Sequence, residues 1–341
     1  MGLRLESRSL SVMSLSNEQP EEPQSQLDQI HLPVMLEPVI ELLRDVAVRP
    51  GAVIVDATLG MGGHTKALLE NFPEVRVIGL DRDLDALTIA SKRLAPFADR
   101  VTFVHAVYDE LHEVLQRLGI DYVDGILFDL GVSSLQLDEA DRGFAYAQDA
   151  PLDMRMNQSE GQTAAEILSS YSEGELRRIF EKFGEEKLAG RYARAIIAAR
   201  QEQAITRTSQ LVQILSDATP AALRDARHPA KRVFQALRIE VNEELSVLAR
   251  AIPAAIESLA VHGRIVFLAY HSLEDRMVKR EFAALATSSA PAGLPLELPE
   301  HKPQLKLLTK GAVLADQRER EKNPRSIPVR MRAAERIRPA S

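Results

Sequence analysis

The sequence predicts a doubly wound α/β fold that carries an inserted all-helical domain. Between residues 50 and 134, short runs rich in β-branched residues alternate with amphipathic segments of helix length, which is typical of βαβ units and a parallel sheet. Between about residues 137 and 259, helical patterns follow one another without strand patterns. Strand patterns return in the C-terminal third, so we expect that third to complete the sheet.

The predicted strands are short and bounded by turn residues. They cover residues 52–55, 75–80, 101–105, 125–129, 264–269, 306–309 and 329–332. Helices are expected from about Thr65, Leu84 and Tyr108. Because parallel strands are joined by right-handed crossovers, their carboxyl ends should gather on one edge of the sheet.

The insert carries its own helix signals. Ser172 and Glu175 form a capping box, and Pro220 and Pro229 mark helix breaks. The predicted domains are a sheet domain over residues 31–136 and 260–341, a helical substrate-recognition domain over residues 137–259, and a leader over residues 1–30. The leader contains scattered Ser, Gln, Glu and Pro without an apolar block, which predicts disorder rather than a signal peptide.

Composition limits the class of protein. The 341-residue chain has no cysteine, which excludes disulfides, iron–sulfur clusters and thiolate zinc sites and makes the cytoplasm the default location. No stretch approaches the roughly 18 to 20 apolar residues of a membrane-spanning helix, so no membrane partner is expected. No metal is inferred either.

The charge distribution argues against a protein that binds nucleic acid over its whole surface, since the formal net charge is -7. The C-terminal tail is the exception, with one acid, Glu335, against five arginines: Arg325, Arg330, Arg332, Arg336 and Arg338. Such a tail can contact phosphate, and a solvated C-terminal face is an equally good interpretation.

Residues 53–64, VIVDATLGMGGH, predict a buried strand that ends on Asp56 and opens into a glycine-rich turn before a helix. Glycines at 60, 62 and 63 remove side chains where the backbone takes unusual dihedral angles and approaches a ligand near a helix N-terminus. Alone, this pattern also fits an ordinary strand-to-helix turn.

The position of Asp81 supports the interpretation of this turn as a ligand-binding site. Asp81 closes the next predicted strand about 20 residues after the glycines, where a carboxylate in a doubly wound fold accepts both ribose hydroxyls. An acid at the end of the first strand followed by Gly-x-Gly-Gly favours S-adenosylmethionine (SAM) over a nicotinamide dinucleotide. The alternative role for Asp81 is an N-cap for the helix from Leu84.

Two further residues lie at predicted strand ends. Tyr108, just past the third strand, can stack on an adenine, although a core aromatic ring is the simpler interpretation. Asp129 ends the fourth strand on the same edge as Asp56 and Asp81. Three carboxylates at one edge suit a cationic sulfonium ligand that also carries an amino group.

From His31 to the C-terminus the sequence resembles the family of small-subunit (16S) ribosomal RNA cytidine N(4)-methyltransferases of the MraW type. The resemblance rests on several long motifs: HLPVMLEPV at 31–39, DATLGMGGHT at 56–65, FDLGVSSLQLD at 128–138, RGFAYAQDAPLDMRM at 142–156, GEEKLAGRYARAI at 184–196, HPAKRVFQALRIEVNEEL at 228–245, YHSLEDRMVKREF at 270–282 and NPRS at 323–326.

The resemblance implies a SAM-dependent methyltransferase fold and methylation of a specific cytidine in the decoding region of 16S rRNA. It implies SAM contacts by Gly62, Gly63, His64, Asp81, Tyr108, Asp129 and Gln136. From the residues alone, His64 would be a polar helix-start residue and Gln136 merely exposed. The family usually has Phe where this chain has Tyr108. Both residues provide an aromatic ring that can stack on the adenine.

The amine of cytosine is a poor nucleophile because its lone pair is delocalised into the ring. Many amino-methyltransferases place an Asn/Asp-Pro-Pro-aromatic loop after the fourth strand, whereas residues 129–134 read DLGVSS here. Our hypothesis is that the segment from Asp129 to Ser134 supplies carbonyl or hydroxyl acceptors for the amine protons, with His271 and Ser272 on the opposite wall of the pocket. The alternative for His271 is a loop histidine with a purely structural role.

RNA contact is expected from the insert and the tail. Basic and polar residues recur at spacings of three or four, and the candidates are His228, Lys231, Arg232, Gln235 and Arg238 on one helix, Arg276, Lys279 and Arg280 on another, and Arg325 in the tail. A merely solvated charged face remains the alternative for each. The family resemblance implies the assembled small subunit as substrate, and a homodimer is compatible with the sequence.

Three rival functions stay open at this stage. They are an amino-methyltransferase for DNA or a small molecule, a SAM-binding or RNA-binding scaffold without turnover, and a nicotinamide oxidoreductase. The missing Pro-Pro loop and the long helical insert count against the first, and the glycine spacing counts against the last.

Overall fold

The computed structural model describes residues 32–223, 228–291 and 298–339. The chain divides into two compact units, one formed by Met1–Gly131 with Val247–Ser341 and the other by Val132–Ser246. The predicted leader, residues 1–30, lies outside the described residues. No helix in the described part of the chain has the length and apolar character needed to cross a membrane.

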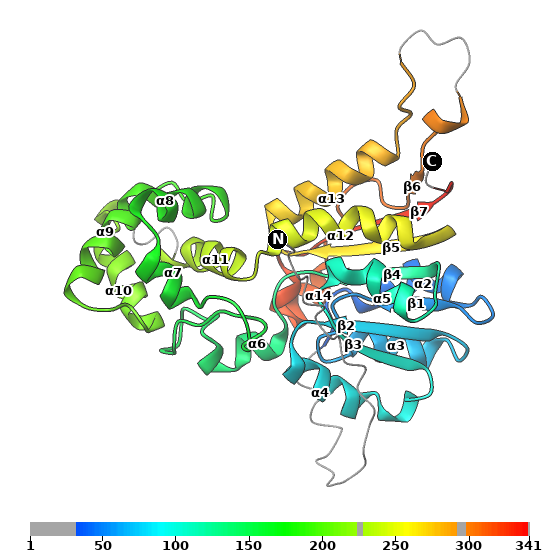
Figure 1. Cartoon of the computed structure of the whole chain (residues 1–341), viewed down its shortest axis with the longest axis horizontal. Coiled ribbons are helices and arrows are strands. Elements are labelled where there is room, and N and C mark those ends of the chain that lie inside the picture. Colours follow the sequence, from blue (N-terminus) through cyan, green and yellow to red (C-terminus); the bar gives the residue numbers. More distant parts are fainter. Residues whose placement is uncertain (1–31, 224–227, 292–297, 340–341) are drawn as a thin grey trace, which may run out of the picture. The chain divides into compact units, whose positions relative to one another are not determined.

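Within the described residues, the first unit is built on one seven-stranded sheet in the order β3-β2-β1-β4-β5-β7-β6 (Figure 1). The strands are β1 Val53–Asp56, β2 Arg76–Asp81, β3 Val101–His105, β4 Val123–Asp129, β5 Leu259–Ala269, β6 Leu305–Leu307 and β7 Arg330–Arg336. Strands β1 to β5 all run parallel to one another, whereas β7 runs antiparallel to β5 and β6. The predicted doubly wound α/β fold is therefore confirmed.

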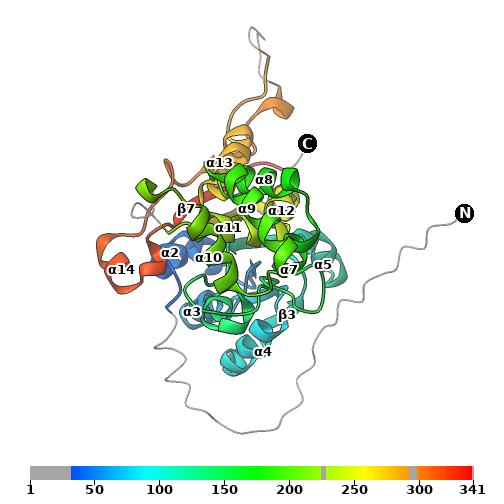
Figure 2. The ribbon, with the colours of Figure 1, turned by 90° about the vertical axis from the view of Figure 1, so that its left-hand side faces the viewer.

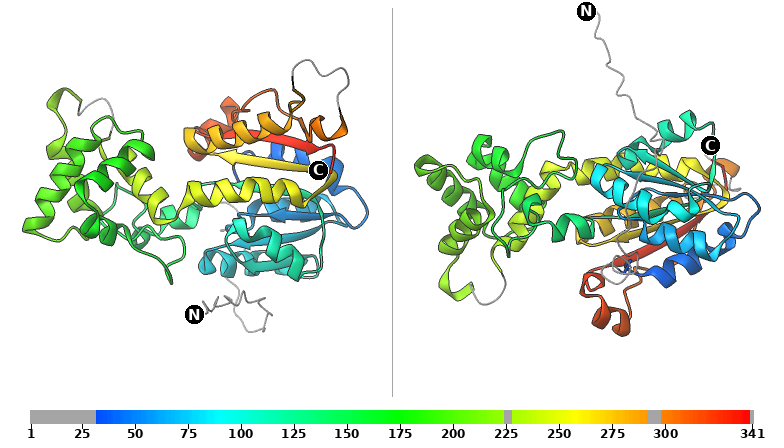
Figure 3. Two further views of the ribbon diagram at one scale, coloured as in Figure 1. Left: turned by 45° about the horizontal axis from the view of Figure 1, so that its top comes forward. Right: turned by 90° about the horizontal axis from the view of Figure 1, so that it is seen from below.

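Helices cover both faces of this sheet. Helices α2 (Leu36–Ala47), α3 (Gly63–Asn71) and α4 (Leu84–Arg93) share a core with Ile54 of β1, and α5 (Leu111–Arg117), α12 (Glu244–Ser258) and α13 (Ser272–Leu285) share the other core with Val53 and Val55. Successive residues of a strand point to opposite faces, so a strand buried on both faces is a continuous apolar run. Figure 3 shows α12 and α13 alongside β5.

The observed unit boundaries, 132 and 246, differ from the predicted 137 and 259. The reason is α12, whose residues Leu248, Ile252 and Ile256 are buried in the core of the sheet. A helical pattern shows that one face is apolar but not which core receives that face.

Within its described residues, the second unit is helical apart from an isolated bridge between Pro151 and Arg207. Its helices are α6 Ser134–Asp138, α7 Ala164–Ser170, α8 Glu173–Lys182, α9 Ala189–Glu202, α10 Thr208–Ala218 and α11 Ala230–Val241. The predicted capping box is present, with the Ser172 amide 2.8 Å from a Glu175 carboxylate oxygen and the Glu175 amide 3.3 Å from the Ser172 hydroxyl. The unit has its own core, which includes Phe180 and Tyr192.

Short elements complete the chain. The 3₁₀ helices are η1 Ala95–Phe97, η2 Tyr108–Glu110, η3 Ala140–Arg142, η4 Ala221–Leu223, η5 Pro299–His301 and η6 Pro324–Ser326, and α14 covers Gln317–Lys322. The segment around α14 is tied to the start of the described chain, because Asn323 donates to the Leu32 carbonyl at 3.1 Å and the Met35 amide donates to Glu319.

Candidate functional site

The glycine-rich turn connects β1 to α3 at the carboxyl edge of the sheet. Gly60 (φ 51°) and Gly62 (φ 74°) adopt left-handed conformations, which favour glycine. Gly63 is required for another reason, because a Cβ there would lie 2.5 Å from Cγ of Pro33. The absent side chain at 63 therefore admits the segment that precedes α2, a role that the sequence analysis did not foresee.

Asp81 follows the strand next to β1 and reaches back to the turn. Its Oδ2 accepts the amide N–H of Gly60 at 2.7 Å, and its Oδ1 accepts that of Asp83 at 2.9 Å. Burial raises the pKa of Asp81 to about 6. The N-cap of α4 is Asp83, which accepts the amide of Asp85 at 3.1 Å, so the alternative role of Asp81 as that cap is wrong.

Asp56, at the end of β1, is 1% exposed and anchors the start of α3. Its Oδ2 accepts the hydroxyl of Thr65 at 2.7 Å, while burial raises its pKa to about 6. Two residues on, the hydroxyl oxygen of Thr58 accepts the amide of Asp129 at 2.6 Å. These bonds hold the ends of β1 and β4 together.

Asp129 is the centre of a polar network. Its Oδ1 accepts the hydroxyl of Tyr270 at 2.7 Å, and its Oδ2 lies 3.8 Å from Nδ1 of His64. Burial raises the pKa of Asp129 to about 7, and the bond from Tyr270 opposes that rise. Burial and the carboxylate of Asp129 raise the pKa of Tyr270 well above 10.

The imidazole of His64 is buried and its pKa is lowered by burial. Nε2 lies 3.0 Å from the carbonyl oxygen of Val34, which can only accept, so Nε2 carries the proton. In the neutral ring Nδ1 then presents a lone pair toward Asp129.

Tyr108 opens η2 directly after β3, as the sequence analysis expected. Its ring meets that of Phe128 with centroids 5.5 Å apart and an interplanar angle of 86°. The ring is half-buried against the core of the sheet. A position between core and edge suits a ring that packs on one side and stacks on a ligand with the other.

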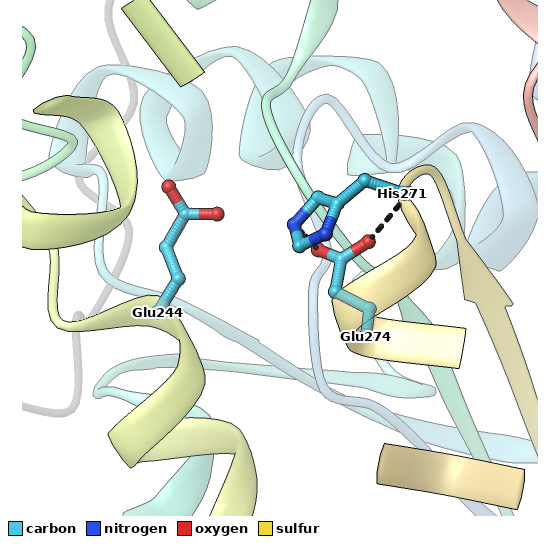
Figure 4. A group of neighbouring side chains, drawn as sticks. All are labelled: Glu244, His271 and Glu274. Atoms are coloured by element: carbon cyan, nitrogen blue, oxygen red, sulfur yellow. Dashed lines mark hydrogen bonds and ion pairs between the residues drawn. The ribbon is translucent and has the colours of Figure 1, made fainter. Parts of the chain in front are cut away.

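His271 and Ser272 lie where β5 passes into α13. Nε2 of His271 is 3.2 Å from Oε1 of Glu274, and the other oxygen of Glu274 accepts the amides of Tyr270 (2.8 Å) and His271 (3.2 Å). Figure 4 shows the imidazole facing this carboxylate. Glu274 is 2% exposed and accepts these two amides, so it anchors the start of α13, while neither ring nitrogen of His271 forms a hydrogen bond to a described residue.

Two predicted site residues belong to the second unit. Gln136 is 4% exposed, so the expectation of an exposed side chain is wrong. Its Oε1 accepts the amide of Ser133 at 3.1 Å, as in a capping box at the start of α6. The side chain of Ser134 lies outside the described residues.

The predicted RNA-binding face of α11 has partners inside the protein. Arg232 donates to the carbonyl of Glu185, and Gln235 donates to that of Phe183 at 2.8 Å. Arg238 forms a bidentate pair with Glu244 at 2.8 and 2.9 Å, and His228 stacks on Tyr146. Helix packing therefore accounts for the spacing at Arg232, Gln235 and Arg238, whereas His228 and Lys231 are exposed. RNA contact by this face stays a prediction.

The arginine-rich tail is also part of the fold. Arg336 is 4% exposed and donates to the carbonyls of Glu257 and Leu259, and Arg332 pairs with Asp275 at 2.6 Å. Both lie in β7, so a free phosphate-binding tail is not what these residues form. Arg325 is half-buried in η6, and the exposed candidates Arg276, Lys279 and Arg280 lie on α13.

The sequence analysis did not single out Tyr270, Thr58 or Glu274. A usable signal existed for Tyr270, since it directly follows the last residue of β5 just as Asp129 ends the neighbouring β4. Polar residues at the carboxyl ends of adjacent parallel strands meet at one edge. Thr58 and Glu274 are visible as network members only in three dimensions.

The sheet order and the carboxylates at one edge define a Rossmann-like methyltransferase fold. The model of the MraW methylase family matches residues 28–337, and the chain belongs to that family. It is similar to "Ribosomal RNA small subunit methyltransferase H" of Leifsonia xyli subsp. xyli (strain CTCB07), with 62% identity over 309 residues, covering 91% of this chain and 95% of that protein.

A second relative agrees with this. The protein of the same name from Clavibacter michiganensis subsp. michiganensis (strain NCPPB 382) is 62% identical over 312 residues, covering 92% of this chain and 98% of that protein. Among solved structures, an rRNA methylase from Streptococcus thermophilus aligns with a TM-score of 0.39 and 11% identity, covering 88% of this chain and 95% of that one.

Proposed function

We propose that this chain transfers a methyl group from SAM to the N(4) amine of a specific cytidine in the decoding region of 16S rRNA, within the small ribosomal subunit. Membership of the MraW methylase family and the name shared by the relatives support the substrate class. The observation that carries the cofactor assignment is the bond from Gly60 to Asp81, which joins the glycine turn to the predicted ribose acceptor.

The residues present fit SAM. Asp56, Asp81 and Asp129 are carboxylates at the ends of β1, β2 and β4, and a ligand with a sulfonium and an ammonium group favours their ionised forms. We assign Asp81 to the ribose hydroxyls, Tyr108 to the adenine and Asp129 to the cationic end. Gly62, Gly63 and His64 would line the turn, and the family resemblance adds Gln136.

Bound SAM supplies an activated methyl group for an in-line displacement. The chain's task is then to orient the amine and exclude water. Acceptors for the amine protons would restore nucleophilicity to the nitrogen, and we assign this role to Asp129, Ser134, His271 and Ser272. The carboxylate of Glu274 lies 3.2 Å from Nε2 of His271, within reach of a protonated ring, as a proton acceptor at this position would require.

The test is methyl transfer from labelled SAM to purified small subunits, followed by mass spectrometry of the rRNA. We expect label in one 16S cytidine. Label in DNA or in small amines alone would favour the rival methyltransferase, and SAM binding without any transfer would favour a scaffold. Titration with a nicotinamide dinucleotide checks the oxidoreductase alternative. Mass photometry tests the homodimer.

Variants separate binding from chemistry. Asp81→Asn should weaken SAM binding by at least about tenfold, because an amide cannot accept from both Gly60 and Asp83 and loses the charge. Asp85→Asn, on the exposed side of α4, is the matched control. Full single-turnover rates in both His271→Ala and Ser134→Ala would remove those residues from the proposed role.

A further inference from the structure

Most arginines of the second unit have partners inside that unit. Four of them form ion pairs at 2.7 or 2.8 Å: Arg155 with Asp153, Arg177 with Glu181, Arg207 with Asp149, and Arg238 with Glu244. Arg200 donates to the carbonyl oxygens of Leu168 and Tyr171. These contacts hold the helices and loops of the unit together, so the side chains serve the fold.

The outer face of α9 differs. Lys187, in the turn before the helix, and Arg191 and Arg194 within it are exposed, and no hydrogen bond or ion pair joins their side chains to any described residue. Arg191 and Arg194 are spaced by three residues and so share one face of α9, and Lys187 lies in the turn that leads into the helix, four residues before Arg191. The opposite face, with Tyr192 and Ile196, is buried in the unit's core, which fixes the cations outward.

Arg177 of α8 borders this face. Its Cδ would lie 3.6 Å from a Cβ at position 190, an ordinary van der Waals distance, so α8 and α9 are close together at Gly190. Arg177 is paired with Glu181 at 2.8 Å and therefore borders the face without adding net charge. Figure 2 shows α8 beside α9.

Acidic residues are kept off this face. After Lys187 the next acid in the sequence is Glu202, the last residue of α9. Of the two acids before the turn, Glu186 is buried and accepts the amide of Leu188 at 2.8 Å, whereas Glu185 is exposed. Like charges one turn apart destabilise a helix, and no ion pair to a described residue relieves them here. In a chain of net charge -7, such a face fits an anionic partner.

We propose that this α9 basic face, formed by Lys187, Arg191 and Arg194, binds the phosphate backbone of the RNA substrate. The inference rests on the proposed function, which makes RNA the substrate. Guanidinium groups match phosphate oxygens in bidentate pairs, and an ammonium group binds them as a point charge. The only aromatic residue of α9, Tyr192, is buried, so the face offers no ring for base stacking. Its contacts therefore position the RNA rather than identify its sequence.

The test compares the wild-type protein with R191A/R194A in binding to deproteinised 16S rRNA and to intact small subunits over a range of salt concentrations. We expect the slope of log affinity against log salt to fall by about one unit for each arginine removed, and affinity at low salt to fall roughly tenfold. KM for small subunits should rise by the same factor, while kcat and the Kd for SAM stay at wild-type values.

Two controls accompany this comparison. R191K/R194K keeps the charge and should keep the salt slope, which also shows that the helix tolerates substitution. R76A/R117A removes two exposed arginines of the first unit and the same charge, so it should leave the slope unchanged. Thermal unfolding of each variant reports on folding.

The outcomes separate the inference from the function on which it rests. A wild-type salt slope and KM in R191A/R194A would overturn the α9 basic face, while methylation of 16S rRNA would keep the proposed function. Affinity lost for intact subunits but not for deproteinised rRNA would assign the face to a ribosomal protein and overturn the RNA inference. If the wild-type protein methylates no rRNA, the proposed function fails, and the slopes for bound RNA still decide the role of the face.

Discussion

The hydroxyl of Tyr270 donates a hydrogen bond of 2.7 Å to Oδ1 of Asp129, although 141 residues separate them. Asp129 ends β4 and Tyr270 follows β5, and these strands are parallel neighbours. The bond stabilises the ionised carboxylate, whereas burial and the neighbouring carboxylate of Glu274 favour the protonated one. Tyr270 therefore influences both the orientation of Asp129 and its charge.

Tyr270→Phe should weaken SAM binding. Phe removes the hydroxyl that donates to Asp129 but keeps the aromatic ring. That ring packs next to Gly131, about 3.6 Å from where a Cβ at that position would lie. Hydrogen bonds to charged groups contribute about 1.5 kcal/mol or more, so we expect Kd to rise roughly tenfold at pH 7.5. Isothermal calorimetry measures this, and the midpoint of the pH dependence should move upward.

Tyr122→Phe is the control for that substitution, since Tyr122 is 59% exposed. Unchanged Kd and an unchanged pH profile in Tyr270→Phe would show that Tyr270 acts only through packing.

SAM affinity should rise between pH 5.5 and 8. Burial raises the pKa of Asp129 to about 7 and those of Asp56 and Asp81 to about 6. A cationic ligand needs ionised carboxylates, so protons must leave on binding below these values. For each proton released on binding, Kd for SAM rises about tenfold for every pH unit below the pKa of the carboxyl group concerned.

Calorimetry in buffers of different ionisation enthalpy counts these protons. The neutral analogue 5′-methylthioadenosine lacks both positive charges, so its affinity should not follow the ionisation of Asp129. A flat profile for SAM over this range would contradict the prediction, as would the same profile for both ligands.

Gly63→Ala should destabilise the first unit. The new Cβ would lie 2.5 Å from Cγ of Pro33, and overpacking of this kind costs about 1 to 3 kcal/mol. Pro33→Ala removes Cγ and should recover much of that loss in the double variant. Urea unfolding of the four proteins gives the coupling energy, and simple additivity would rule out this contact as the cause.

Arg238→Ala should lower the free energy of unfolding without changing the salt dependence of RNA binding. The bidentate pair with Glu244 is mostly buried, with 17% and 8% of the side chains exposed. Removing Arg238 leaves the buried carboxylate of Glu244 without a counter-charge, which lowers the free energy of unfolding by about 2 kcal/mol or more. Denaturant unfolding and salt-dependent RNA binding measure the two effects, and a reduced salt slope would restore Arg238 as an RNA contact.

Much of the first unit was predictable because its signals are local. The runs around Val53, Val77 and Val101 are apolar and end in turn residues, and each became a strand within one or two residues of the prediction. Strand β5 starts at Leu259 instead of 264, since its first residues alternate irregularly between buried and exposed positions. The spacing between Gly60 and Asp81 also predicted their proximity, because neighbouring parallel strands bring such residues to one edge.

Faces of helices were harder to predict. Arg232, Gln235 and Arg238 have the spacing of an outward basic face, yet all three donate to the protein. Lys187, Arg191 and Arg194 have the same kind of spacing and point outward. Helical periodicity places residues on a common face, and only the packing of neighbouring helices decides whether that face meets solvent or protein.

The order of residues along the chain was enough to establish the sheet, the glycine turn and the acidic strand ends, because backbone preferences and burial patterns act over a few residues. Only the folded structure established that Tyr270 meets Asp129, that Pro33 requires Gly63, and that α12 belongs with the sheet. Each of these contacts is between residues that are far apart in the sequence. Such contacts depend on how the chain packs in three dimensions, which cannot be predicted from a short stretch of sequence.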